Sequence, residues 1–211
     1  MREIRTWYTA QRIQRTLAAL EKNGFQTSFA STRDEALEKV LSLVPQSAKV
    51  GVGGSVTLRE INLIDVLTMR GNTVSQHWHQ PEQNVVRIMR EELNSDVYLA
   101  SSNAVTEDGR LINIDMTGNR VAAMIFGPPK VILVIGVNKI VKDVDEGIKR
   151  VKNVATPMNA HRLGLKVPCA STGVCTDCDA EDRLCRVTMI IEKRPSRSDM
   201  SVILVGEELG F

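Results

Sequence analysis

AKVGVGGSVTLREINLIDVLTMRG, residues 48–71, joins a strand pattern directly to a helical pattern. Residues 48–52 are a short apolar run of strand character, and a glycine-rich turn follows at residues 51–55. Thr57 and Glu60 form a capping-box signature for the start of a helix. Apolar residues then recur at helical spacing, namely Leu58, Ile61, Ile64 and Leu67, until Gly71 ends the pattern. A strand that turns into a helix in this way is typical of an α/β protein.

The same alternation continues along the rest of the chain. Residues 131–136 predict the central strand, because they form a continuous apolar run that follows the break at Gly127-Pro128-Pro129. Further strands are predicted at residues 25–30, 72–77, 96–101, 110–115, 186–192 and 201–205, and residues 121–126 fit either a strand or a short helix. Helices are predicted up to Asn23, over residues 32–44, from Thr57, from Pro81, over residues 142–155 and from Pro157. We therefore predict an α/β fold with a mainly parallel sheet flanked by helices, in a single domain over residues 1–211.

The charge balance excludes several function classes. The chain has 211 residues, of which 27 are basic and 25 acidic, so its net charge is +2. This balance gives no electrostatic basis for binding nucleic acid, and an aromatic content of 4% argues against a base-stacking platform. No apolar run reaches the roughly 18 residues that predict a transmembrane helix, and the N-terminus lacks an apolar signal-peptide segment. We expect a cytoplasmic protein that neither binds nucleic acid nor inserts into a membrane.

The glycine-rich turn is the first candidate site. Gly51, Gly53, Gly54 and Ser55 lie between a predicted strand and a predicted helix. Backbone N–H groups at the start of a helix attract anions, and glycines let a ligand approach them closely. The turn therefore predicts binding of a small anionic substrate through a phosphate or carboxylate. A tight strand-to-helix turn without a ligand is the alternative interpretation.

Polar residues around the strand at 110–115 form the second candidate site. Asn113 and Asp115 lie two residues apart, on one face of that strand. Glu107 and Asp115 are the candidate catalytic residues, as a general base or nucleophile. The candidate ligand-binding residues are Asn103, Asn113, Asn119 and Arg120. Asn, Asp and Gly are also the ordinary residues of turns, so a set of turns remains the alternative.

All four cysteines lie in one short segment, residues 165–187, which also carries Pro168 and Gly173. The spacing is Cys169-x5-Cys175-x2-Cys178-x6-Cys185, and its C-x2-C pair places two thiolates within reach of one metal. The four cysteines predict a metal site that holds either an iron–sulfur cluster or Zn²⁺. Among iron–sulfur clusters, a 4Fe–4S cluster is the first choice. Four free thiols and a redox disulfide between Cys175 and Cys178 remain alternatives.

The histidines and Arg162 carry weaker signals. His77 and His79 flank Trp78 at the end of a predicted strand. They are interpreted either as metal ligands or a base, or as partly exposed loop residues. Arg162 is interpreted either as an anion-binding residue or as part of a solvated helix face.

Two long motifs resemble the LUD (lactate-utilization domain) family. The first is Ser102-Asn103-Ala104-Val105-Thr106-Glu107-Asp108-Gly109 with Asn113-Ile114-Asp115-x-Thr117-Gly118-Asn119-Arg120. The second is Pro157-x-Asn159-Ala160-x-Arg162-Leu163 with the cysteine segment, which is similar to a cysteine-bearing branch of stand-alone family members. The resemblance covers about residues 5–206 and implies a fold similar to that of sugar-phosphate isomerases and CoA-transferases. In that superfamily the turn at residues 51–55 would bind substrate, and Glu107 loosely matches a nucleophile.

The resemblance also implies a function. Some family members belong to a multi-subunit system that oxidises L-lactate to pyruvate beside iron–sulfur subunits. The first hypothesis is therefore a redox-linked component of lactate or organic-acid oxidation, with iron–sulfur redox proteins as partners. The second is an isomerase- or CoA-transferase-like enzyme with a structural zinc, and the third is a non-catalytic binding module. A homodimer is expected by analogy with such domains.

Overall fold

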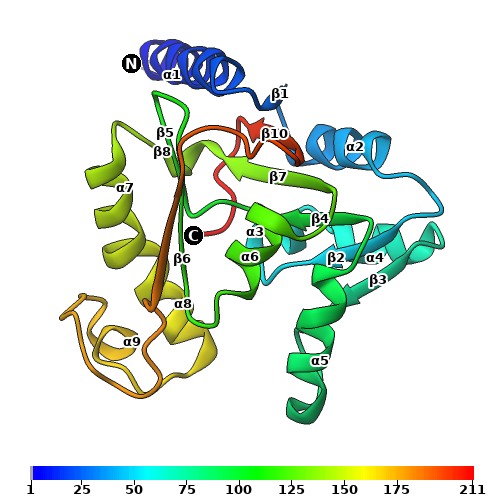
Figure 1. Cartoon of the computed structure of the whole chain (residues 1–211). Helices are drawn as coiled ribbons and strands as arrows, with labels where there is room; N and C mark the ends of the chain where they lie inside the picture. The colour runs from blue at the N-terminus through cyan, green and yellow to red at the C-terminus, as the bar shows by residue number, and fades with distance from the viewer. Residues whose placement is uncertain (1) are drawn as a thin grey trace.

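The structure, a computed structural model, describes residues 2–211 and confirms the α/β class (Figure 1). The helices are α1 (Arg2–Lys22), α2 (Arg33–Leu43), α3 (Val56–Glu60), α4 (Leu63–Met69), α5 (Glu82–Leu93), α6 (Asn119–Phe126), α7 (Val144–Arg150), α8 (Thr156–Leu163) and α9 (Pro168–Thr172), with a 3-10 turn η1 (Val137–Lys139) and a π-helical turn η2 (Val151–Ala155). The strands are β1 (Gln26–Ala30), β2 (Lys49–Val52), β3 (Thr73–Gln76), β4 (Val97–Ala100), β5 (Ala104–Thr106), β6 (Leu111–Asp115), β7 (Lys130–Gly136), β8 (Ile140–Val141), β9 (Val187–Ile191) and β10 (Asp199–Val205).

A six-stranded parallel sheet in the order β1-β10-β7-β4-β2-β3 forms the centre of the protein. Every residue of β7 after Lys130 is buried, and successive side chains of a strand point to opposite faces of the sheet. Strand β7 is therefore covered on both faces. Val131, Leu133 and Ile135 pack with α1 and α6, whereas Ile132 and Val134 pack with α2, α3 and α4. Two helical layers therefore cover the sheet, as the continuous apolar pattern of residues 131–136 predicts.

A smaller four-stranded sheet, in the order β8-β5-β6-β9, lies beside the first. Strands β5 and β6 form an antiparallel hairpin, and β9 pairs antiparallel with β6 from Val187 to Ile191. Residues 121–126, which fitted either a strand or a helix, are helical and form most of α6. Within residues 2–211 no helix is both long and apolar enough to cross a membrane.

The helix predicted from Thr57 differs in two ways from the observed structure. Ser55, not Thr57, is its N-cap, because the Ser55 hydroxyl accepts a hydrogen bond of 3.3 Å from the Leu58 N–H. The helix is also split into α3 and α4 by Asn62, whose φ of 54° lies in the left-handed region. Leu58, Ile61 and Leu67 are nevertheless buried, since both short helices turn their apolar side to the sheet.

The cysteine segment lies beyond the sheet, against α8. Helix α7 continues through the π-helical turn into α8, and the short helix α9 then carries Cys169. Residues 173–186 form neither helix nor strand before β9 begins. Figure 1 shows this segment as a loop on one side of the protein, with α5 projecting on the other side of a gap.

Candidate functional site

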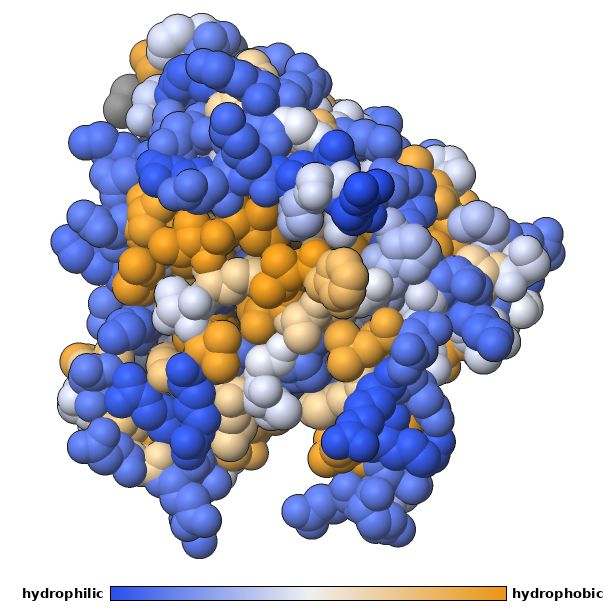
Figure 2. All heavy atoms as spheres, viewed as in Figure 1, coloured by the Kyte–Doolittle hydropathy of each residue, from blue (hydrophilic) through white to orange (hydrophobic). Residues whose placement is uncertain are grey.

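A polar cleft opens where the parallel strands end. A cavity of about 460 Å³ is lined by residues that follow β2, β4 and β7 and by the loop after β3. Residues of α5 and α8 form opposite walls, and Figure 2 shows the surface hollowed between these two helices. Ligands of open parallel sheets bind at the carboxyl ends of the strands, so this is the position at which a small-molecule site is expected.

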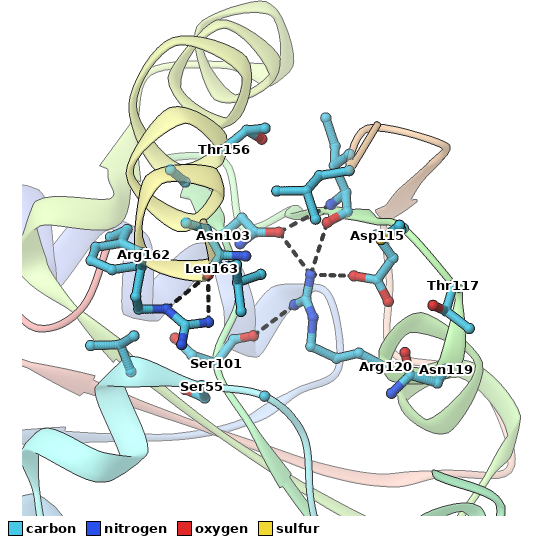
Figure 3. Close-up of a pocket in the computed structure, with 18 of the residues that line it drawn as sticks. Ser55, Ser101, Asn103, Asp115, Thr117, Asn119, Arg120, Thr156, Arg162 and Leu163 are labelled. Carbon is cyan, nitrogen blue, oxygen red and sulfur yellow. Dashed lines mark hydrogen bonds and ion pairs between the residues drawn. The ribbon is translucent and has the colours of Figure 1, made fainter. Parts of the chain in front are cut away.

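Arg120 holds one wall of the cavity together (Figure 3). Its Nη1 donates to the Ser101 carbonyl at 3.0 Å and to Asn113 Oδ1. Its Nη2 donates to Asn103 Oδ1 at 2.8 Å and to Asp115 Oδ1 at 2.5 Å. The side chain is nearly buried, at 11% exposure, and Asp115 is at 6%. Arg120 therefore acts as a fixed brace between β4, β6 and α6, with its Nη hydrogens already engaged.

Lys139 lies at the base of the cavity, at the end of the 3-10 turn η1 that follows β7. Its Nζ donates to Thr57 Oγ1 at 2.8 Å and to Ser101 Oγ at 3.0 Å, and the residue is only 3% exposed. Burial, followed by the nearby positive charges of Arg150 and Arg120, lowers the pKa of Lys139 to about 7. Within residues 2–211 no carboxylate pairs with it. An amine with only hydroxyl partners is suited to receive an anionic ligand.

His77 and Glu92 form a second polar pair behind the cavity. His77 Nδ1 is 2.8 Å from Glu92 Oε1, and the Glu92 side chain is 1% exposed. Burial raises the pKa of Glu92, although His77 opposes this effect. A Cβ added to Gly54 would lie 3.3 Å from His77 Nε2, so this nitrogen faces the glycine turn and the cavity. A histidine with one nitrogen on a buried carboxylate and the other free is suited to proton transfer.

Trp78 forms the outer part of the same wall. The guanidinium carbon of Arg162, from α8, lies 4.2 Å from its ring centroid, and that of Arg59, from α3, lies 4.1 Å away. Both distances are typical of cation–π contacts. Burial lowers the pKa of Arg162, and the charge of Arg59 adds to this effect. Two arginines therefore share one indole at the mouth of the cavity.

The structure brings most of the predicted site residues to this cavity. Those that line it are Gly54, Ser55, Asn103, Asp115, Asn119 and Arg120. Asn113 is buried behind them and orients Arg120. Gly51 and Gly53 serve packing: a Cβ would lie 2.6 Å from the Glu92 carbonyl at Gly51, and 2.5 Å from the Tyr98 hydroxyl at Gly53.

Glu107 lies away from the cavity at the sheet edge. It occupies the turn of the β5–β6 hairpin and pairs with Arg12 and Arg15 of α1, both at 2.9 Å. Partial burial raises its pKa, but the hydrogen bonds from Arg15 and Arg12 outweigh this, so the net pKa is lowered. Glu107 does not line the cavity. The structure thus separates it from Asp115, the other residue predicted to be catalytic.

The four cysteines line a second, small cavity together with Arg183. All four are free thiols, and Cys169 is buried. Burial raises the pKa of Cys169, and the other three cysteines add to this effect, so the thiols lie close enough to interact electrostatically. Within residues 2–211, however, no three His, Cys, Asp or Glu side chains are positioned to hold a metal ion. The donor set suits a metal, whereas the side-chain arrangement is not that of a closed metal site.

The two cavities share a wall. Thr156, at the start of α8, and Leu184 line both of them. Cys185 Sγ lies 3.4 Å from Thr156 Oγ1. One layer of residues therefore separates the cysteines from the cavity at the sheet edge.

Sequence reasoning did not identify Lys139, Glu92 or the hydroxyl of Ser101 as site residues. Lys139 follows the central strand by three residues, so the rule that ligands bind at strand ends was the available signal. Glu92 looks like an ordinary charged residue of a helix, because nothing in its own segment marks it as buried. Ser101 directly follows β4, so the same rule about strand ends applies to it.

Comparisons with known proteins agree with this architecture. A profile of the LUD domain family matches residues 13–205. The crystal structure of a DUF162 family protein from Deinococcus radiodurans is similar with a TM-score of 0.57 and 16% identity, over 94% of this chain and 98% of that chain. A search among curated proteins found no match. At such identity the structural likeness concerns the fold, whereas the profile spans the chain from α1 to β10, and the chain therefore belongs to the LUD domain family.

Proposed function

We propose that this protein binds an organic acid of the lactate type in the cavity at the sheet edge and serves as a redox-linked component of organic-acid oxidation. An iron–sulfur cluster on Cys169, Cys175, Cys178 and Cys185 is part of the proposal. The family assignment supports a function related to lactate utilization at the level of the family. The observation that carries the proposal is the shared wall of Thr156 and Leu184 between the cysteine cavity and the sheet-edge cavity.

In this proposal Lys139 binds the carboxylate of the acid. Its amine lies at the base of the cavity, held by the hydroxyls of Thr57 and Ser101. A bound carboxylate favours the charged form of the amine, so binding near neutral pH is accompanied by proton uptake. Arg120 contributes indirectly, because it fixes the Ser101 backbone and the side chain of Asn103.

His77 is the proposed binding partner of the 2-hydroxyl group. With Glu92 on Nδ1, its Nε2 can accept a hydrogen bond from the hydroxyl of a 2-hydroxy acid. Val85 and Met89 of α5 line the cavity together with His77 and add apolar surface to it.

The cysteine cavity fits an iron–sulfur cluster in its donor chemistry. Four thiols from one segment are the usual ligand number, and such a cluster supplies one-electron transfer when bound. Arg183 donates to the carbonyls of Cys178 and Cys185, which places a positive charge beside the thiols. That charge would offset the negative charge of the thiolates.

Anaerobically purified protein is expected to be brown and to contain roughly four iron and four sulfide per chain. Cys178→Ser should lose most of both, because it removes one of four ligands. Thr176→Ser, in the same loop, is the matched control and should keep the wild-type content. Colourless protein with about one zinc per chain and no sulfide would overturn the redox role. That result would instead favour an organic-acid enzyme with a structural zinc.

Glu107→Gln is expected to leave the affinity for lactate and pyruvate within about twofold of wild type, because Glu107 lies outside the cavity. The same substitution should lower the free energy of unfolding by about 1 kcal/mol, since it weakens the contacts with Arg12 and Arg15. Calorimetric titration and urea denaturation measure the two effects. A tenfold loss of affinity with unchanged stability would contradict the assignment and return Glu107 to the site.

A further inference from the structure

The volume of the cavity exceeds what a three-carbon acid requires. Its volume of about 460 Å³ lies within the range of roughly 300–1,000 Å³ that is typical of sites for larger ligands. Apolar side chains from opposite walls line the middle, among them Val85 and Met89 from α5 and Leu163 from α8. A three-carbon acid held at Lys139 would fill only part of this volume.

The cavity also has more positive charge than one carboxylate can balance. Lys139 and Arg162 both line it, and within residues 2–211 neither forms an ion pair with a carboxylate. Among the described residues, Asp115 is the one Asp or Glu side chain that lines the cavity, and Arg120 already engages it. Two cationic groups on different walls are therefore available to a ligand.

Arg162 is held in place without using a negative charge. Its Nε and Nη2 donate to Asn159 Oδ1 at 3.1 and 2.7 Å, and its plane lies over Trp78. The backbone of Trp78 is held in turn, because its backbone N–H donates to Gln76 Oε1 at 3.1 Å. Figure 3 shows Arg162 reaching from α8 toward Ser55 and Ser101, on the side of the cavity opposite Asp115. A guanidinium fixed by neutral partners in this way costs little further entropy when it binds an anion.

We infer that the acid bound here carries a second anionic group, a carboxylate or a phosphate, which Arg162 binds at the mouth while Lys139 binds the first carboxylate. The inference rests on the proposed function and names the substrate class of the same site: a 2-hydroxy or 2-oxo acid with two anionic ends. The apolar middle of the cavity packs against the carbon chain between them.

Two matched pairs of acids test the inference by calorimetric titration of the full-length protein. 2-Hydroxyglutarate and 2-hydroxyvalerate have the same five-carbon chain, with a carboxylate or a methyl group at the far end. 3-Phosphoglycerate and glycerate differ by the phosphate. We expect at least one doubly anionic acid to bind about tenfold more tightly than its singly anionic partner, and the better pair identifies the second group.

The gain is expected to disappear in Arg162→Gln, so that the two acids of each pair bind this variant with about the same affinity. Arg87→Gln is the matched control, because Arg87 is an exposed arginine of α5 that pairs with Glu91. It should keep the gain. Equal affinities within both pairs, or a gain that survives in Arg162→Gln, would overturn the inference and leave the proposed function in place. Absence of binding for all four acids would overturn both.

Discussion

Replacement of Arg120 by alanine is expected to lower the free energy of unfolding by about 3–5 kcal/mol, the usual cost of breaking a buried ion pair from one side. The substitution leaves Asp115 at 6% exposure with its charge uncompensated. It also removes one hydrogen bond each to Asn103 Oδ1, Asn113 Oδ1 and the Ser101 carbonyl. Because these groups belong to separate elements, the damage extends from β4 to α6.

Urea denaturation of wild type and Arg120→Ala measures this effect. Arg87→Ala is a suitable control, since its exposed pair with Glu91 should contribute only about 0.3–0.5 kcal/mol. Arg120→Lys should also be strongly destabilised, because one ammonium cannot replace the hydrogen bonds of both Nη1 and Nη2 of the guanidinium. A loss below about 1 kcal/mol for Arg120→Ala would show that the network does not hold the two sheets together.

Lys139→Met is expected to have the opposite effect on stability, an increase in the free energy of unfolding near neutral pH, because within residues 2–211 no carboxylate pairs with the buried lysine charge. The reason is the lowered pKa of about 7, against an ordinary value of 10.5. Below pH 7 the Lys139 amine is charged in both the folded and the unfolded protein. The folded protein then carries the full cost of burying that charge. Between pH 7 and about 10.5 the unfolded state binds more protons, so wild-type stability rises with pH. The hydroxyls of Thr57 and Ser101 keep their own bonds to backbone carbonyls in the variant.

The difference between variant and wild type isolates this effect from all other titrating groups. Urea denaturation at pH 6.5 and pH 9.5 should show a stability advantage of Lys139→Met that is larger at the lower pH. A difference that does not change between the two pH values would mean that burial does not lower the pKa of Lys139. A residue that costs stability and lies in a cavity is typical of a functional site.

The class of the fold was predictable from local patterns because the longer strands and helices have a clear apolar period, whereas the short elements β5, β8 and α9 were not predicted. Residues 131–136 and the strand-turn-helix unit at residues 48–71 sufficed for the class, and the LUD assignment agrees with the motifs that resemble that family. The split at Asn62 was not predictable, because the apolar spacing from Leu58 to Leu67 continues across it. Only the packing of two short helices on the sheet selects a left-handed residue there.

The site was predictable in part. Asn103, Asn113, Asp115 and Arg120 meet as the polar cluster indicated, since Asn103 and Asp115 lie at the same end of the β5–β6 hairpin. Glu107 lies at the turn end of that hairpin, so its closeness to this cluster in sequence does not bring it to the cavity. The roles of Lys139 and of the His77–Glu92 pair depend on tertiary burial, which no local pattern encodes.

Calorimetric titration of wild type and Lys139→Met with lactate and pyruvate, in two buffers of different ionisation enthalpy, tests most directly whether Lys139 binds the acid. Wild type is expected to bind the acid at pH 7 with uptake of a fraction of a proton, and its affinity is expected to fall as the pH rises above 7. Lys139→Met should lose binding while remaining folded. Binding that is equal in both proteins, or that involves no proton uptake, would contradict the claim that Lys139 at the sheet edge is the organic-acid site.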